Sequence, residues 1–561
     1  MRETKDCETV VVIGKESVGK SELVASLTGT SPKSGNFRGT TIESEIYETS
    51  EYRFVDTPGI TLEADTETTR EALGALDGSE NVLLVVPAMS IDEHLSDLLS
   101  LVEGKSGTVA VTFWDKVDDH EAAEHALGEL SEDLEVPVVP VDARSVSRPI
   151  ADGGSRTLSD PKQPTGASAA HVLNAIDAAG QFPGTSTSRV GQHVEPPESI
   201  FERAYVGPVV AGIFLLLPAL AAVWFALGIA DRLDPAVEAA LEPALEWATG
   251  LPEPLSAILA AEYGLLSMGP FLFVWAGPTI LIFAVFIGAY KASGLITRIT
   301  TAVHPFMSQI GLTGHDLVRV VMGFGCNVPA VTSTRSCSSC TRCTTISAIS
   351  FGAACSYQFP ATLAVFAAVD MPWLVGPYLL VLVVTTLLYI RVIAPSEARG
   401  SSMAIEGRTF LQWPSPSAIW REARGSLRSF IVTALPVFIG ICVVAALADW
   451  LGAIERLGSA LGPAMGVFNL PAEAALVVVL ASVRKDGIAL LSADAAGIAA
   501  LSPVQVLVAV YLAGVLLPCL VTAFTIAREI SPRYVAKMMA RQAIAAVGFS
   551  LAIAWGGVLL F

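Results

Sequence analysis

Apolar residues dominate the second half of the chain in runs long enough to cross a lipid bilayer. About 20 helical residues, rising 1.5 Å each, span roughly 30 Å of hydrocarbon. Seven uninterrupted runs meet this length, at residues 206–230, 268–290, 346–369, 373–393, 430–448, 501–526 and 543–561. Two further runs, 317–331 and 474–498, contain Gly, Pro or charged residues. The pattern predicts a polytopic all-α transmembrane domain in which some helices are broken.

The first half has a different pattern, in which short apolar segments alternate with mixed polar ones. Five segments are predicted to be buried strands, at residues 8–13, 52–55, 82–86, 109–113 and 136–141. Strands that alternate with helical stretches are typical of a parallel sheet covered by helices. We therefore expect an N-terminal α/β domain over residues 1–148.

A third pattern separates these two halves. Residues 149–200 are rich in Ser, Gly, Pro, Thr and Gln, and only residues 168–179 have a helical pattern. Such a composition is typical of a linker. The transmembrane domain then occupies residues 201–561. Interrupted segments in two halves of such a domain are typical of transporters, which predicts two gate regions at about 268–395 and 428–561.

The charge of the chain is unevenly distributed. The net charge of the 561 residues is −19, and residues 1–200 hold 35 of the 54 acidic residues but only 15 of the 35 basic ones. This imbalance argues against nucleic acid as a partner, because a phosphate backbone requires a basic surface. An acidic surface suits strong salt, so a halophilic source is one interpretation and an ordinary acidic domain is the other.

Arginines in the second half predict how the chain crosses the membrane. They cluster at residues 391–428 and 528–541, which marks both loops as cytosolic. The acidic loop at 231–262 then lies outside. Residues 1–9 have no apolar core, so we expect no cleavable signal peptide. These features predict a multi-pass plasma-membrane protein whose N-terminal domain is cytosolic.

A phosphate-binding loop follows the first predicted strand. Residues 14–21 read Gly-Lys-Glu-Ser-Val-Gly-Lys-Ser and lead into a helical stretch. In such a loop the backbone N–H groups and Lys20 bind nucleotide phosphates, and the Ser21 hydroxyl binds Mg²⁺. The candidate nucleotide-binding residues here are Gly14, Ser17, Val18, Gly19, Lys20 and Ser21.

Three more residues follow in the order that a GTPase requires. Asp56 ends the strand at 52–55, where it would hold Mg²⁺ together with Ser21 and Thr41, and the Gly59 N–H would sense the γ-phosphate. Lys20, Thr41, Asp56 and Gly59 are therefore the candidate catalytic residues. Ile60 stands where Ras-like enzymes place a water-orienting Gln, which predicts slow hydrolysis of GTP, about 10⁻⁴ to 10⁻² per second.

The predicted base-binding residues lie after the last two strands. Residues 115–118 resemble the Asn-Lys-x-Asp motif with which GTPases recognise guanine, and here they are Asp115, Lys116, Val117 and Asp118. Asp118 is the expected guanine ligand. Asp115 replaces the Asn and removes an amide donor, which leaves the choice between GTP and ATP open. Asp142, Ala143 and Arg144 complete the candidate pocket.

Cysteines in the apolar half coincide with residues that break helices. Residues 323–330 read Gly-Phe-Gly-Cys-Asn-Val-Pro-Ala, in which Pro329 lacks an N–H and the glycines permit unwinding. Cys355 and Cys519 also stand near prolines. The candidate ligands of a transported metal ion are Cys326, Asn327, Cys355 and Cys519. Thiolate and amide oxygen ligands suit Fe(II), and also Zn(II), Mn(II) or Co(II).

Other polar groups in this half have two interpretations. Cys337, Cys340 and Cys343 have a spacing that suits a metal or an iron–sulfur cluster if a fourth ligand comes from elsewhere, and otherwise they are reduced thiols at a helix end. Residues 484–487, Arg-Lys-Asp-Gly, are either the gate of the second half, which we prefer, or a cytosolic cap. His304 and His315 are expected to be surface residues.

Taken together, these motifs resemble the ferrous-iron transport protein B family, FeoB. The resemblance rests on the phosphate-binding loop, the Asp-x-x-Gly element at 56–59, the octapeptide at 323–330 and Pro518-Cys519-x-x-Thr522. It implies a prokaryotic plasma-membrane importer of Fe(II), with GTP and Mg²⁺ bound by the cytosolic G domain. It also implies that Cys326 and Cys519 lie in paired gate regions, with Cys355 in a matching segment.

The chain also departs from this family. Only about 50 residues stand where the family has a helical domain before the first span, so we expect this domain to be shortened or missing. Ser17 replaces an Asn that the family associates with potassium activation, which leaves potassium dependence open. With the acidic surface, the resemblance suggests a halophilic archaeon as the source.

Two rival functions are kept beside Fe(II) import. One is transport of another divalent metal, Zn or Mn, by the same architecture. The other is a regulatory GTPase that the spans only tether to the membrane. Small accessory iron-transport proteins and a second copy of the chain are candidate partners.

Overall fold

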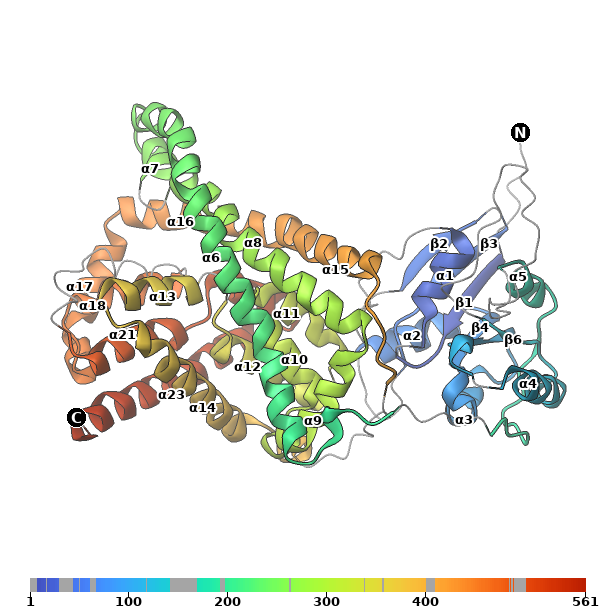
Figure 1. Ribbon diagram of the computed structural model, residues 1–561. Helices are drawn as coiled ribbons and strands as arrows, with labels where there is room; N and C mark the ends of the chain where they lie inside the picture. Colours follow the sequence, from blue (N-terminus) through green and yellow to red (C-terminus); the bar gives the residue numbers. More distant parts are fainter. Residues whose placement is uncertain are drawn as a thin grey trace. The chain divides into compact units, whose positions relative to one another are not determined.

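The computed structural model describes residues 8–560 apart from 17, 30–43, 50, 61–66, 118, 142–168, 192–196, 262–263, 338, 356–357, 400–408, 484, 486–487 and 489–500. The chain forms two compact units, one built mainly of Met1–Pro197 and the other mainly of Glu198–Phe561. The first unit is α/β and the second is helical (Figure 1). Both parts of the predicted fold class are therefore confirmed.

The first unit contains one sheet with the strand order β2-β3-β1-β4-β5-β6, and β7 pairs with β5. The strands along the path from β3 to β6 are parallel, whereas β2 and β7 pair antiparallel with their neighbours. Their bounds are β1 (Glu8–Ile13), β2 (Glu45–Glu48), β3 (Tyr52–Asp56), β4 (Asn81–Pro87), β5 (Ser106–Thr112), β6 (Val138–Pro140) and β7 (Gly180–Gln181). The five predicted strands correspond to β1, β3, β4, β5 and β6, and β6 lies at one edge of the sheet.

Helices cover both faces of this sheet. Apolar side chains of α1 (Lys20–Thr28) and α5 (Ala169–Asp177) pack in one core with one face of the strands. Those of α2 (Glu67–Asp77), α3 (Ile91–Val102) and α4 (His120–Leu134) pack in a second core on the other face. A sheet buried on both faces explains why β4 is a continuous apolar run and not an alternating one.

Part of the predicted linker instead packs on the first unit. The Thr108 hydroxyl donates to the Ala175 carbonyl of α5 at 2.7 Å, and the Tyr52 hydroxyl donates to Asp177. Phe182, just after β7, is buried in the second core. Residues 169–191 therefore extend the α/β unit beyond the expected boundary at residue 148. The remainder of the predicted linker lies largely outside the described residues.

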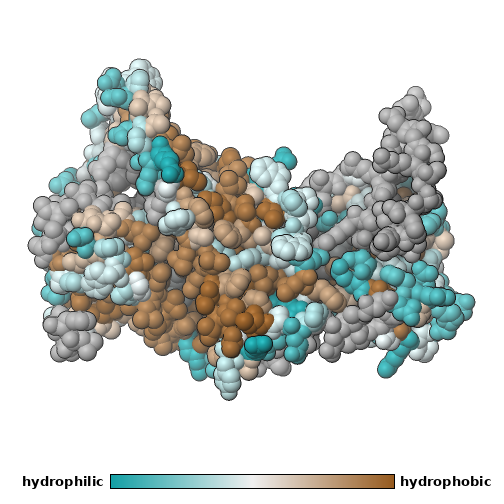
Figure 2. Space-filling view, viewed as in Figure 1, coloured by the Kyte–Doolittle hydropathy of each residue, from teal (hydrophilic) through white to brown (hydrophobic). Residues whose placement is uncertain are grey.

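The second unit is built of helices, several of which are long and apolar. Among the described residues five are long and apolar enough to span a membrane: Val206–Thr249, Pro372–Ile393, Pro416–Trp450, Pro503–Glu529 and Pro532–Gly557. The pair Gly277–Ala292 and Leu295–Ile310, bent by 88°, gives a sixth. Figure 2 shows apolar residues over much of the visible face of this unit. Together these observations support a multi-pass membrane protein.

The α-helices of the second unit begin with the long helix α6 and end with α23. These helices have the following bounds. They are α6 (Val206–Thr249), α7 (Leu255–Ala260), α8 (Leu265–Ala292), α9 (Leu295–Ile310), α10 (Gly314–Met322), α11 (Asn327–Ser333), α12 (Ser339–Gly352), α13 (Gln358–Ala368), α14 (Val375–Ile393), α15 (Pro416–Ser429), α16 (Leu435–Trp450), α17 (Ala453–Met465), α18 (Ala474–Val483), α21 (Pro503–Val515), α22 (Leu520–Glu529) and α23 (Pro532–Leu560). A short π-helical segment, Phe430–Ala434, joins α15 to α16.

One predicted continuous span is wrong, and another, the run at 501–526, contains a break between α21 and α22. The apolar run at 346–369 is divided between α12, which ends at Gly352, and α13, which begins at Gln358. Pro360 lies in the first turn of α13, where its missing N–H costs no helical hydrogen bond. Hydropathy alone does not detect such a break, because residues on both sides of it are apolar.

Two other helix pairs are broken at corresponding cysteines. Cys326 is the N-cap of α11 after the end of α10, and Cys519 is the N-cap of α22 after the end of α21. The helices that follow the breaks also pack together, because Ala330 and Val331 share a core with Ala523 and Ile526. The unit therefore brings two helix breaks of similar construction side by side.

Candidate functional site

The phosphate-binding loop runs from the end of β1 to the start of α1. Gly19 has φ = +90°, a conformation that favours glycine. A Cβ added to Gly14 would lie 2.5 Å from the Val85 carbonyl oxygen of β4. The Thr112 hydroxyl of β5 donates to the Val18 carbonyl at 2.6 Å. Three neighbouring strands thus fix the path of the loop, and two of its glycines are required by geometry.

Lys20 is buried at the centre of this loop. Its ammonium donates to the carbonyls of Gly14 at 3.0 Å and Lys15 at 2.8 Å. Burial lowers the pKa of Lys20 to about 8, and the nearby Asp56 and Glu16 carboxylates oppose this shift. The ammonium is therefore held inside the loop, where it can neutralise phosphate oxygens.

Asp56 lies beside Lys20, within reach of its charge. Its side chain is fully buried, and neither carboxylate oxygen accepts a hydrogen bond of normal geometry. Burial raises the pKa of Asp56 to about 6, while the neighbouring Ser21 hydroxyl and Lys20 charge act in the opposite direction. A buried carboxylate with unsatisfied oxygens next to a hydroxyl fits a hard cation such as Mg²⁺.

Gly59 lies directly against the phosphate-binding loop. A Cβ at this position would be 2.6 Å from the Cα of Glu16. The Ile60 N–H donates to the Gly14 carbonyl at 3.1 Å, which holds the segment in place. The close approach explains the glycine, and it puts the Gly59 backbone at the loop that would hold the phosphates.

The predicted base-binding residues are only partly described. Asp115 and Lys116 lie on the short 3-10 helix Trp114–Lys116 after β5. Lys116 Nζ and Asp115 Oδ2 form an ion pair at 2.7 Å. The other predicted nucleotide and Mg²⁺ ligands lie outside the described residues, namely Ser17, Thr41, Asp118, Asp142, Ala143 and Arg144.

In the second unit, the cysteines at three helix breaks belong to the same region. Cys326 lies within electrostatic reach of both Cys355 and Cys519. The Cys519 Sγ contacts the Thr522 hydroxyl at 3.0 Å. Asn327 is buried, and its Oδ1 has no hydrogen-bond partner. Candidate ligands from three separate stretches of the sequence thus belong to one region inside an apolar helical unit.

These side chains do not form a closed metal site. Among the described residues, no three His, Cys, Asp or Glu side chains are placed so that they could hold one metal ion. A cation in this region would therefore need oxygen ligands as well, and the unpartnered Asn327 Oδ1 is one such oxygen.

Two buried polar side chains near the same region were not singled out from the sequence. Gln358 Nε2 donates to the Tyr378 hydroxyl at 3.0 Å, and a Cβ on Gly514 would lie 2.5 Å from this Nε2 atom. Gln358 therefore lies beside the end of α21. A glutamine two residues before a proline in an apolar run is the signal that could have identified it.

Lys485 belongs to the charged stretch at 484–487, and it is the described residue of that stretch. Its ammonium is buried and donates to backbone carbonyls at the end of α21. This places Lys485 at the second break, and Arg484, Asp486 and Gly487 lie outside the described residues.

Among the residues that the structure describes, the other cysteines and histidines that the sequence analysis considered do not belong to the region around Cys326. Cys337 is buried and Cys343 is exposed, and the side chain of Cys340 lies outside the described residues. His304 Nδ1 accepts a hydrogen bond from the Gly314 N–H at 3.3 Å. His304 is thus held at the start of α10 by a structural contact.

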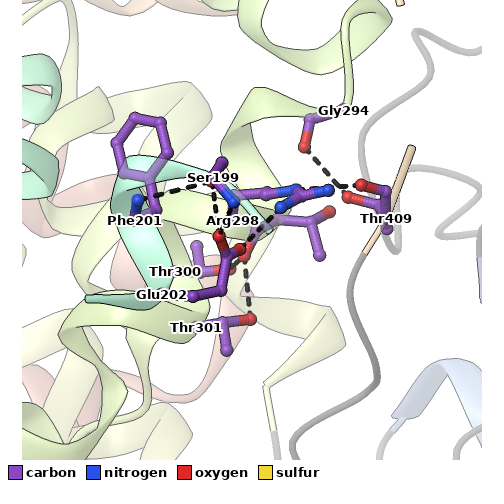
Figure 3. Close-up of polar contacts among 9 residues, drawn as sticks. Ser199, Phe201, Glu202, Gly294, Arg298, Thr300, Thr301 and Thr409 are labelled. Carbon is purple, nitrogen blue, oxygen red and sulfur yellow. Dashed lines mark hydrogen bonds and ion pairs between the residues drawn. The ribbon is translucent and has the colours of Figure 1, made fainter. Parts of the chain in front are cut away.

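An ion pair ties the start of the second unit to its bent helix pair (Figure 3). Arg298 Nη1 donates to Glu202 Oε1 at 2.8 Å, and Arg298 Nε donates to the Thr409 carbonyl at 2.9 Å. The Thr409 hydroxyl donates to the Gly294 carbonyl, and Gly294 lies at the bend between α8 and α9. Ser199 caps the turn that carries Glu202. The network joins the entering chain, the bend and the segment before α15.

Comparison with known proteins agrees with this organisation. A family model described as "Ferrous iron transport protein B" matches residues 8–148, and one described as "Nucleoside recognition", the Gate model, matches residues 273–369. The protein named Fe(2+) transporter FeoB of Synechocystis is 26% identical over 353 residues, which is 58% of this chain and 56% of that protein. The chain thus spans about half the length of the curated relatives it matches.

Two further proteins are similar over a shorter stretch or at lower sequence identity. A fusion protein of Porphyromonas gingivalis, named Fe(2+) transport protein A/Fe(2+) transporter FeoB, is 33% identical over 86 residues, which is 15% of this chain and 10% of that protein. The solved structure of NFeoB from S. thermophilus bound to GDP.AlF4- and K+ is 18% identical, with a TM-score of 0.24, over 53% of this chain and 91% of that one. The two family models and the named relatives thus show that residues 8–148 match the ferrous iron transport protein B model, and that about 58% of the chain is similar to proteins named Fe(2+) transporter FeoB.

Proposed function

We propose that this protein imports Fe(II) across the plasma membrane, and that GTP binding and hydrolysis by its N-terminal unit control the passage. The observation that carries the proposal is the convergence of Cys326, Cys355 and Cys519 at three helix breaks inside an apolar unit. Thiols and backbone carbonyls at such breaks are ligands for a dehydrated soft cation. Relatives named Fe(2+) transporter FeoB support iron as that cation.

In the N-terminal unit the described residues suit a triphosphate. In this proposal Lys20 neutralises phosphate oxygens, and the Gly59 N–H responds to the γ-phosphate. Bound Mg²⁺ supplies positive charge that offsets the charge developing on the phosphates, and Ser21 and Asp56 would hold it together with Thr41. Ile60 is buried, which agrees with slow hydrolysis that lacks a water-orienting side chain at this position.

Changes in the N-terminal unit reach the transmembrane unit through the chain that connects them. This chain enters at Ser199–Glu202, where Arg298 links it to the α8–α9 bend. GTP binding would order the loops around Thr41 and Gly59. This ordering would change the conformation of residues 199–202, and the gate regions at about 268–395 and 428–561 would then open. The loop arginines predict that the N-terminal unit is cytosolic, so GTP in the cytosol would control the passage.

A flux measurement with matched variants tests the proposal. Purified protein in liposomes is expected to carry Fe(II) inward when GTP is present on the side of the N-terminal unit. Cys326→Ser should lower this flux by at least about tenfold, as expected for loss of a metal ligand, with GTP hydrolysis retained. Cys343→Ser removes an exposed thiol of the same unit and should leave the flux unchanged.

The same experiment separates the rival functions. Zn(II) or Mn(II) carried in preference to Fe(II) would replace iron as the substrate. GTP hydrolysis without flux of any metal would show a tethered regulatory GTPase instead. Unchanged Fe(II) flux in Cys326→Ser, at equal amounts of protein in the membrane, would remove this cysteine from the passage.

A further inference from the structure

Lys485 has unusual surroundings for a charged side chain in an apolar helical unit. It is 5% exposed, and its ammonium donates to the carbonyls of Gly514 at 2.5 Å and Leu517 at 2.6 Å. The Ala513 carbonyl lies at 3.4 Å. Three backbone oxygens thus surround one nitrogen, and hydrogen bonds from a charged donor are shorter and stronger than those between neutral groups.

The break after α21 explains why these carbonyls are available. In a continuous helix the Gly514 carbonyl would accept from residue 518, but Pro518 has no N–H. Helix α21 ends at Val515 and α22 begins at Leu520. Among the described residues, the Ala513 and Leu517 carbonyls likewise accept no backbone hydrogen bond from residues 517 and 521. The last turn of a helix is also its negative end, so this group of oxygens attracts a cation.

The thiols of the proposed passage lie at the same place. Cys519 follows Leu517 by two residues, and the Lys485 ammonium is in electrostatic reach of both Cys519 and Cys355. Carbonyl oxygens at an unwound helix end, combined with thiols, form the kind of site in which a transporter holds a cation. Here the chain's own ammonium occupies the carbonyl part of the site.

We propose that Lys485 is a tethered cation that closes the passage, and that an ion crosses only by displacing its ammonium from the Gly514 and Leu517 carbonyls. This inference rests on the proposed transport function. A divalent, thiophilic ion gains both the carbonyls and the nearby thiolates when it replaces the ammonium. Na⁺ and K⁺ bind thiols poorly and carry a single charge, so they gain little binding free energy when they displace the ammonium. These ions are therefore excluded from the passage. Lys485 is thus a selectivity residue as well as a closing residue.

Removal of the charge is expected to open the passage. Lys485→Met keeps the length and the apolar contacts of the side chain, while Lys485→Gln retains an N–H donor for the carbonyls but no charge. Both should raise the nucleotide-free leak of Na⁺ into liposomes by about tenfold or more, in line with the effect of a local charge on ion entry. Lys485→Arg should stay closed. Lys537→Met removes an exposed lysine of the same unit and serves as the control.

A second measurement uses the wild-type protein and does not depend on how the variants fold. Acetylation of Lys485 by acetic anhydride is followed by mass spectrometry in full-length protein in liposomes. Because the ammonium is buried, its acetylation should be slow, and Co(II), which binds thiolates and does not oxidise readily, should accelerate it by displacing the side chain. Acetylation of Lys537 should be the same with and without Co(II).

The outcomes distinguish the two proposals. If Lys485→Met and Lys485→Gln leak no more Na⁺ than wild type, or if Co(II) leaves Lys485 acetylation unchanged, Lys485 does not close the passage. If wild type carries no Fe(II) with any nucleotide, the transport function fails. In that case the Na⁺ leak and the acetylation still decide whether Lys485 blocks a cation site.

Discussion

At the scale of single residues, burial determines how the nucleotide-binding corner is charged. Lys20 begins α1, after the loop that follows β1, and Asp56 ends β3, the parallel neighbour of β1. The fold therefore brings opposite charges together in a buried site. The loop sequence and the Asp-x-x-Gly element predicted both residues. Their burial, and the close approach of Gly59 to Glu16, could not be predicted, because they depend on how the loops fold over each other.

Lys20→Ala is expected to weaken GTP binding by about 10- to 100-fold, because a hydrogen bond to a charged group contributes about 1.5–3 kcal/mol. Titration of the full-length protein with a fluorescent GTP analogue measures this effect. Lys105→Ala is a suitable control, since Lys105 donates to the Ser79 carbonyl at the opposite end of the sheet. Equal affinity of wild type and Lys20→Ala would refute the assigned role.

Asp133 gives a prediction with a defined dependence on pH. Hydrogen bonds from the side chains and backbone of residues 186–188 lower the pKa of its carboxyl below the ordinary value of 3.8. A lowered pKa means that the carboxylate stabilises the folded unit above about pH 4, and that this contribution is lost as the pH falls further. Asp133→Asn should therefore lower the unfolding temperature at pH 7.

The same comparison at lower pH provides the check. The difference in unfolding temperature between wild type and Asp133→Asn should shrink below about pH 4 as wild-type Asp133 takes up a proton. Glu129→Gln changes an exposed acid on the same helix and should have no such pattern. A difference that stays constant down to pH 3 would contradict the role of Asp133 in holding residues 186–188.

At the scale of elements, the sequence predicted strands better than it predicted helix breaks and boundaries. The inner strands β1, β4 and β5 are largely apolar and buried, which leaves a clear pattern, while β3 alternates between buried and exposed residues. Helix α5 and strand β7 are short, and tertiary contacts such as that of Thr108 with Ala175 hold them on the sheet, so composition alone placed them in a linker. The break before α13 was missed because it lies within an apolar run.

The network around Arg298 is the element-scale feature that we expect to couple the two units. The Arg298 side chain is 1% exposed, so its loss leaves the Glu202 carboxylate in a partly buried place with its cation removed. Breaking a buried pair in this way costs about 3–5 kcal/mol. Arg298→Met is therefore expected to lower the unfolding temperature and to make Fe(II) flux independent of GTP, while GTP hydrolysis persists.

A double variant provides the control for this prediction. Arg298→Met with Glu202→Gln leaves no buried charge, so it should recover much of the stability without recovering coupling. Arg232→Met removes an exposed arginine of α6 and should change neither property. Normal GTP dependence of flux in a stable Arg298→Met protein would show that coupling takes another route.

At the scale of the whole molecule, an acidic α/β unit is joined to an apolar helical unit of near-zero net charge. The sequence predicted this division, the membrane helices and the similarity to proteins named Fe(2+) transporter FeoB, because hydropathy and the motifs are local signals. The convergence of Cys326, Cys355 and Cys519 was implied by the resemblance, while the role of Lys485 required the tertiary structure. The halophilic archaeal source and the shortened helical domain stay predictions.

The most direct test of the account is Fe(II) flux into proteoliposomes with GTP, GDP, ATP or no nucleotide on the side of the N-terminal unit. We predict flux with GTP that exceeds the flux with GDP or no nucleotide by about 5- to 150-fold, the usual range for coupling between two sites. Flux with ATP equal to that with GTP would show that Asp115 has removed the preference for guanine. Fe(II) flux that is absent, or equal in all four conditions, would contradict the central claim.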